Sequence, residues 1–109
     1  MSDLTQKHCV PCEGGTPRFT SAQIAQYMEK LGDGWTSVDD ARIQKTFQYT
    51  NFVEALAFVN HVGTIAEAEQ HHPDIHIHYN KVVIELWTHA IEGLSENDFI
   101  VAAKIDQIS

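Results

Sequence analysis

Histidines are concentrated in one short stretch of the chain. Residues 67–80 read EAEQHHPDIHIHYN and contain four of the seven histidines, and His89 follows soon afterwards. An unperturbed imidazole has a pKa near ~6.5, so histidine can give or take a proton at neutral pH, and it is also a common metal ligand. The stretch is compatible with an acid–base site, a metal site or a histidine-rich surface without chemistry.

His71 and His72 lie at a position in the predicted fold that suits proton transfer. Pro73 disfavours helical geometry at His72, so the preceding helix must end there and leave both imidazoles in a rigid helix-to-strand loop. Loops held by a rigid scaffold are where catalytic groups collect. Glu67 lies one helical turn before His71, and its carboxylate could orient an imidazole. The spacing alone slightly favours His71 and His72 as ordinary capping or surface histidines. His89 ends a predicted strand and could face the same pocket.

The case for a metal is weaker. His76 and His78 alternate along one strand face, as in some metal sites, but no third ligand follows at a suitable spacing. A solvated strand face with a His76–Glu85 cross-strand pair is favoured about three to one. Cys9 and Cys12 could form half a zinc site or a redox pair, but neither a second ligand pair nor a preceding strand supports this. We therefore predict no metal ligand.

The surrounding elements follow from apolar spacing and capping signals. Thr20-x-x-Gln23 is a capping box that opens a helix ending at Gly32 and Gly34. Residues 35–38 and 41–49 are predicted strands, with Lys45 the exception on an apolar face. Asn51 begins a helix over residues 51–69. This helix carries two apolar stripes, which predicts that it contacts a second copy as well as the sheet. The two stripes are Phe52, Leu56, Val59 and Ala66, and Phe58, Val62 and Ile65.

Residues 74–88 are predicted to form a hairpin with Asn80-Lys81 as its turn. This register gives the cross-strand pairs Tyr79–Val82, Ile77–Ile84 and Ile75–Leu86. Ser95-x-x-Asp98 then caps a last helix whose inner stripe is Val101, Ile105 and Ile108. The order αββαββα predicts an α+β domain with a four-stranded antiparallel sheet and helices packed on one face.

Length and charge limit the function classes. The 109 residues suit a single domain over residues 1–109, with residues 1–19 as a loose, turn-forming N-terminal arm. The formal net charge of -8 repels phosphate backbones, so nucleic-acid binding is not expected. No apolar run approaches the roughly 20 residues that span a bilayer, and no signal peptide is recognisable, so a cytoplasmic location is the default expectation.

The combined motifs resemble the pterin-4a-carbinolamine dehydratases from about Thr20 to the C-terminus. The matching residues are Glu67-x-x-x-His71-His72-Pro73, Tyr79-Asn80-Lys81-Val82, Thr88-His89 and Gly93-Leu94-Ser95-x-x-Asp98. The resemblance implies the αββαββα fold and dehydration of 4a-hydroxytetrahydropterin to quinonoid dihydropterin, without a metal or organic cofactor. This reaction recycles the cofactor of aromatic amino acid hydroxylases.

The resemblance also implies roles for individual residues. His71 and His89 would be the acid–base pair, while His72 would hold the pterin or share in proton transfer. Glu67 and Asp98 would orient or charge-balance these histidines. The implied pterin contacts are Gln70, His71, His72, Trp87, Thr88, His89 and Ala90. Ile75, Gln70 and Trp87 depart from the tryptophan, aspartate and serine of animal members, so the contacts made by those side chains are open.

The resemblance extends to partners. Family members are typically dimers or tetramers, and a functional link to a phenylalanine hydroxylase fits the chemistry. One alternative is a protein-binding module, because some animal relatives are dimerisation cofactors of a homeodomain transcription factor. Another is a binder of a related pterin such as a molybdopterin.

Overall fold

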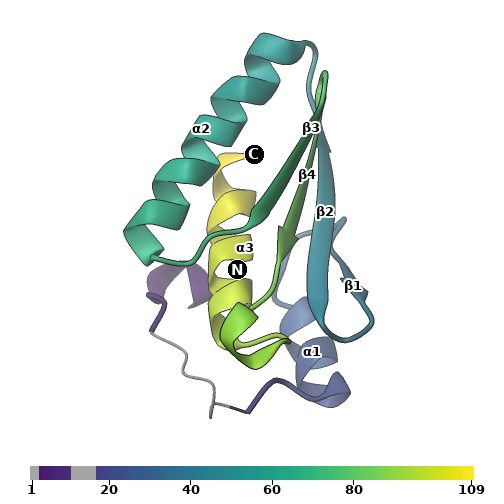
Figure 1. The fold of residues 1–109 in the computed structure, drawn as a ribbon, viewed down its shortest axis with the longest axis vertical. Helices are drawn as coiled ribbons and strands as arrows, with labels where there is room; N and C mark the ends of the chain where they lie inside the picture. Colours follow the sequence, from purple (N-terminus) through teal and green to yellow (C-terminus); the bar gives the residue numbers. More distant parts are fainter. Residues whose placement is uncertain (1–2, 11–16) are drawn as a thin grey trace.

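A computed structural model describes residues 3–10 and 17–109. The order of its helices and strands along the chain is the predicted αββαββα, with a short 3-10 helix before the first helix and another before the last. Helices α2 and α3 cover one side of the sheet (Figure 1). The elements are η1 (Asp3–Gln6), α1 (Ser21–Met28), β1 (Thr36–Val38), β2 (Arg42–Gln48), α2 (Phe52–Glu69), β3 (Asp74–His78), β4 (Lys81–Leu86), η2 (His89–Ile91) and α3 (Glu96–Ile108).

The sheet joins two antiparallel hairpins in the order β1-β2-β4-β3. Central strands β2 and β4 pair over six positions, from Ile43–Leu86 to Gln48–Lys81. Strand β3 lies at one edge, so one row of its backbone groups has no partner within the described sheet. The α+β class, the antiparallel sheet and the helices on one face are confirmed.

The register predicted for the second hairpin was wrong. The turn is Tyr79-Asn80, and Ile77 lies opposite Val82 rather than Ile84. All three predicted pairs shift by two residues, so each side chain keeps its face of the sheet. Tyr79 adopts a left-handed φ of 56°, and the Asn80 amide donates to the carbonyl of Tyr49 at 2.9 Å. This bond ties the observed turn to the residue that follows β2 and stabilises it there.

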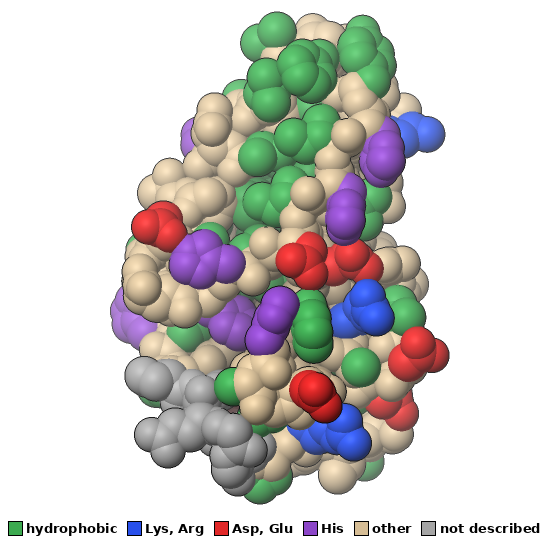
Figure 2. Space-filling view, in the orientation of Figure 1, with side chains coloured by type: hydrophobic (Ala, Val, Ile, Leu, Met, Phe, Trp, Pro, Cys, Tyr) green, Lys and Arg blue, Asp and Glu red, His purple; other side chains and the backbone are tan. Residues whose placement is uncertain are grey.

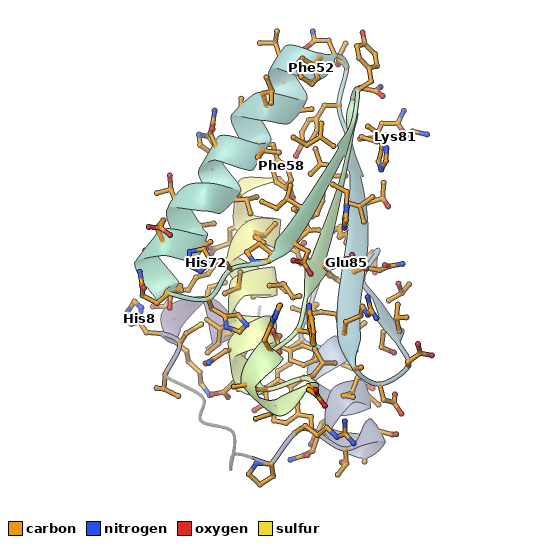
Figure 3. All side chains as sticks on the ribbon, in the orientation of Figure 1. His8, Phe52, Phe58, His72, Lys81 and Glu85 are labelled. Atoms are coloured by element: carbon orange, nitrogen blue, oxygen red, sulfur yellow. The ribbon has the colours of Figure 1, made fainter. Side chains whose placement is uncertain are left out.

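The core lies between the sheet and helices α2 and α3. Phe58 projects from α2 towards the sheet (Figure 3), where its ring lies 4.6 Å from that of Phe47. Lys45, which interrupts the apolar face of β2, is held by Asp106 at 2.9 Å and lies over the Phe47 ring at 4.8 Å. Its charge is therefore paired at the margin of the core. The core side chains contributed by the two central strands and α2 are Ile43, Phe47, Val82, Ile84, Leu86, Ala55, Phe58 and Val62.

The predicted helix starts are correct, but one helix end and one apolar stripe need correction. Asn51 accepts a hydrogen bond from the Glu54 N–H at 2.9 Å, and Thr20 forms its predicted capping box. Helix α1 ends at Met28, before the predicted glycines. Helix α3 is buried around much of its circumference rather than along one stripe, and Ile108 is 38% exposed.

The N-terminal arm explains the additional burial of α3. Leu4 in η1 is fully buried within the core, and η1 packs against α3. Lys7 reaches Glu96 at the start of α3 at 2.9 Å. The described part of the arm is therefore packed and not loose as predicted, while Pro11, Cys12, Gly14 and Gly15 lie outside the described residues.

Candidate active site

His71 and His72 lie at the edge of a pocket, directly after the end of helix α2. Gln70 adopts the left-handed conformation, with φ 53° and ψ 38°, and the His71 N–H donates to the carbonyl of Ala66 at 3.2 Å. Such a left-handed residue is a common helix terminator. Pro73 follows and turns the chain into β3, as the sequence predicted.

His71 is held by a buried carboxylate. Its Nε2 lies 2.6 Å from Oδ1 of Asp98, and the exposed fractions of the two side chains are 12% and 0%. The contact therefore lies out of solvent, where a charge-assisted hydrogen bond is at its strongest. A carboxylate oxygen accepts, so Nε2 is the donor in this bond and Nδ1 of His71 takes no part in it.

Asp98 is itself fixed by two further hydrogen bonds. Its Oδ2 accepts from the Thr88 hydroxyl at 2.8 Å and from the Ser95 backbone N–H at 2.9 Å. The Thr88 and Ser95 hydroxyl oxygens lie 2.8 Å apart. The predicted capping pair Ser95–Asp98 thus anchors a carboxylate that also orients His71.

His72 has a carboxylate partner in a different setting. Its Nε2 lies 2.5 Å from Oε2 of Glu67, but the two side chains are 57% and 75% exposed. Figure 3 shows His72 projecting at the C-terminal end of α2. The suggested pairing of Glu67 with His71 was wrong, because α2 ends before a further turn could bring them together.

His89 lies in a short closed loop beside Trp87. Thr88 and Gly93 form a two-hydrogen-bond bridge at the base of this loop, with N···O distances of 2.8 and 3.4 Å. The rings of His89 and Trp87 stack with centroids 3.9 Å apart, and the Trp87 N–H donates to Asp74 at 3.1 Å. An aromatic surface and a titratable imidazole are therefore presented together.

One pocket of about 650 Å³ brings these groups together. This volume lies within the range of roughly 300–1,000 Å³ typical of small-molecule sites. Glu67 and Asp98 are not among its lining residues, but each contacts a histidine that is. The described lining residues predicted from sequence are Gln70, His71, His72, Trp87, Thr88, His89 and Ala90.

Five further lining residues were not predicted: Cys9, Val10, Ala68, Glu69 and Asn97. Glu69 was missed because, at 8% exposed, its role depends on the distant Lys104, whose Nζ lies 2.6 Å from Oε2. Burial raises the pKa of Glu69, but hydrogen bonds from Lys104, the Cys9 N–H and His8 outweigh it and lower this pKa to about 2. Glu69 is a fixed charge and not a proton donor at neutral pH.

The Cys9 thiol is poorly suited to nucleophilic chemistry. Burial, with the negative charge of Glu69, raises the pKa of Cys9 to about 12. The thiolate is the reactive form of cysteine, and a raised pKa keeps it scarce. Cys12 lies outside the described residues.

His76 and His78 lie on β3 and do not line the pocket. His76 contacts Glu85 at 2.9 Å, as predicted, but diagonally, because its direct partner is Val83. Within residues 3–10 and 17–109, no cluster of three or more His, Cys, Asp or Glu side chains is arranged to hold a metal ion. The same residues include no helix long and apolar enough to cross a membrane.

Comparison with known proteins agrees with this arrangement. The family model described as pterin 4 alpha carbinolamine dehydratase matches residues 17–108. A protein of Nitrosospira multiformis named "Putative pterin-4-alpha-carbinolamine dehydratase" is 49% identical over 108 residues, covering 99% of this chain and 94% of the relative. A protein of the same name from Alkaliphilus metalliredigens is 44% identical, covering 98% of this chain and 96% of the relative.

Solved structures give the same fold. A transcriptional coactivator/pterin dehydratase from Brucella melitensis superposes with a TM-score of 0.79 at 32% identity, covering 84% of this chain and 98% of that one. The residues matched by the family model, 17–108, include the histidine-bearing loops. The chain belongs to the pterin 4 alpha carbinolamine dehydratase family.

Proposed function

We propose that this protein is a hydro-lyase that removes water from a 4a-hydroxytetrahydropterin to give the quinonoid dihydropterin. The observation that carries the proposal is the convergence of His71, His72 and His89 on one pocket, with His71 oriented by a buried carboxylate. Family membership supports the same reaction class.

The reaction requires two proton transfers that balance. The C4a–O bond breaks as an imidazolium protonates the departing hydroxyl, which leaves as water. The N5 proton passes to a neutral imidazole while its bonding pair forms the C4a=N5 double bond. One imidazolium becomes neutral and one neutral ring becomes charged, so proton exchange with water restores the starting state. Each positioned transfer contributes on the order of 10²–10⁴-fold to the rate.

His71 and His89 are the proposed acid–base pair. Asp98 occupies Nε2 of His71 and directs its Nδ1 to the substrate, as the carboxylate of a catalytic triad directs its histidine. His89 is exposed and stacked on Trp87, whose ring offers a surface for the flat pterin. His72, with Glu67, holds the pterin or shares in proton transfer, and Gln70, Thr88 and Ala90 complete the contacts.

The test is the disappearance of enzymatically generated 4a-hydroxytetrahydropterin at mildly alkaline pH, where spontaneous dehydration is slow. Wild type should accelerate it with EDTA present, because the proposed proton transfers use only side chains. No acceleration by a folded sample would refute the dehydratase proposal. A phenylalanine hydroxylase, as the enzyme class that releases this carbinolamine, is the natural source of substrate in the assay.

The proposal includes a homo-oligomer. Large apolar side chains are exposed along α2 and the β3 hairpin, and Figure 2 shows them as a patch at the end of the molecule away from most of the histidines. Such a patch typically marks a protein–protein interface. Its members are Phe52, Val53, Leu56, Ile77 and Tyr79. A monomeric mass in light scattering at micromolar concentration would contradict this part of the proposal.

A protein-binding role is the second candidate. The patch and the coactivator name of the Brucella relative favour it. A folded protein without dehydratase activity that retains a partner-binding patch would move this candidate to the front.

A further inference from the structure

The N-terminal arm forms one wall of the pocket, although it lies far from the histidine loops in sequence. Cys9 and Val10 line the same cavity as His71 and His89. Segments separated by some sixty to eighty residues in sequence therefore meet around one ligand-sized space. Figure 3 shows His8, the residue preceding this wall, beside the C-terminal end of α2.

The Asn97 side chain hydrogen-bonds both the N–H and the carbonyl of Val10. The amide oxygen of Asn97 accepts from the Val10 N–H at 3.1 Å, and its amide nitrogen donates to the Val10 carbonyl at 2.6 Å. Asn97 is 5% exposed, so the side chain that makes both bonds is buried. A paired clamp of this kind fixes the direction of the backbone as well as its position.

Glu69 provides a second anchor one residue earlier. Its Oε1 accepts from the Cys9 N–H at 2.8 Å, and Lys104 holds its other oxygen. Glu69 lies just before the His71 loop, while Asn97 directly precedes Asp98. The two anchors therefore fix the position of Cys9 and Val10 relative to His71 and Asp98.

The wall presents neutral chemistry to the pocket. Glu69 is balanced by Lys104, and the raised pKa of Cys9 keeps its thiol protonated. Val10 is 65% exposed and lines the pocket, so a ligand there can reach it. A short alkyl or hydroxyalkyl group suits this surface, whereas a charged tail would gain no ionic partner from Cys9 or Val10.

We propose that Val10 and Cys9 contact the substituent at C6 of the pterin and select a short neutral one, with Asn97 as the positioning residue. This inference rests on the proposed dehydratase function. In the substrate, C6 is bonded to N5 and N5 to the reacting C4a. A pterin held with C4a and N5 at the histidines must therefore place its C6 substituent close to them, in the pocket that Cys9 and Val10 also line.

The experiment compares two carbinolamine substrates, one carrying a 6-methyl group and the other a 6-(1,2-dihydroxypropyl) group. Val10→Trp should raise the KM for the larger substrate about tenfold more than for the smaller one, with little change in kcat, because pocket contacts discriminate by such factors. Asn97→Leu releases the wall and should instead lower the KM for the larger substrate relative to that for the smaller one. Ser37→Trp, at an exposed position on β1 outside the pocket, is the matched control.

Equal KM changes for both substrates, or a Val10→Trp effect no larger than that of Ser37→Trp, would overturn the inference while leaving the dehydratase intact. Inactive wild type would instead refute the proposed function. In that case calorimetry measures the affinities of the stable 7,8-dihydropterins that carry the same two substituents. This binding experiment tests the role of Cys9 and Val10 without depending on catalysis. An unchanged ratio of their affinities in Val10→Trp, or no binding to wild type, would overturn it.

Discussion

The pairs His71–Asp98 and His72–Glu67 lie at the same pocket in opposite surroundings. His71 and Asp98 are 12% and 0% exposed, whereas His72 and Glu67 are 57% and 75% exposed. Contacts between exposed charges are weakened by water and salt, while buried ones are not. We infer that His71 is held in one orientation, whereas His72 can turn as a ligand enters.

A third pair extends the comparison beyond the pocket. His76 and Glu85 are 51% and 17% exposed and lie on the sheet, away from the lining residues. The three pairs have similar chemistry but differ in burial and in access to the pocket. Changing one carboxylate or imidazole at a time therefore separates these two factors.

Asp98→Asn should have the largest effect on activity. The amide keeps the shape but removes the charge that orients His71, and the analogous loss in a catalytic triad costs about 10⁴-fold. We expect kcat to fall by roughly 10²–10⁴-fold. Asp106→Asn is the matched control on the same helix, since it loses the contact to Lys45 but touches no pocket residue. Its kcat should stay within about twofold of wild type, and comparable losses in both variants would contradict the assignment.

Glu69→Gln should have the next largest effect, on stability. The carboxyl pKa falls from 4.5 to about 2 on folding, which corresponds to a contribution on the order of 3 kcal/mol. Because the folded pKa is the lower one, the contribution is fully present above pH 4.5 and is lost as pH falls towards 2. Denaturant unfolding of both proteins from pH 7 to pH 2 should show their difference shrinking in that window. A difference independent of pH would contradict the fixed-charge role.

Glu67→Gln should have a smaller effect than Asp98→Asn. An exposed pair contributes about 0–1 kcal/mol, so stability should barely change and activity should fall by less than about tenfold. Steady-state kinetics of the two variants, measured in parallel, gives the ratio directly. If Glu67→Gln lost as much activity as Asp98→Asn, burial would not be what distinguishes the two pairs.

His76→Ala should have the smallest effect. The residue contacts Glu85 outside the pocket, so kcat and KM should remain within about twofold of wild type, while stability changes by less than about 0.5 kcal/mol. The same assay and a thermal melt check this expectation. A large loss of activity would bring the sheet face into the mechanism.

Sequence reasoning succeeded where the signals were local. Capping residues and apolar spacing predicted the order of the elements, and Pro73 predicted where the helix before the histidines ends. The hairpin register failed because a shift by two residues leaves every side chain on the same face, so apolar alternation cannot distinguish the two registers. The contact that anchors the observed turn, from Asn80 to Tyr49, joins distant parts of the chain.

The sequence pointed to the histidines of the candidate site but not to the wall formed by Cys9 and Val10. His71, His72 and His89 lie in motifs with recognisable spacing. The arm residues carry no such pattern, and their positions depend on Asn97 and Glu69, far along the chain. Contacts of this kind leave little trace in local sequence, because the partners are ordinary polar residues whose roles depend on burial.

The most direct test of the central claim is the rate of 4a-hydroxytetrahydropterin dehydration by wild type, His71→Ala and His76→Ala under identical conditions with EDTA. The account predicts that wild type and His76→Ala accelerate the reaction equally and that His71→Ala loses most of this acceleration while remaining folded by circular dichroism. Full activity in His71→Ala would contradict the proposed mechanism, and no acceleration by wild type would contradict the function itself.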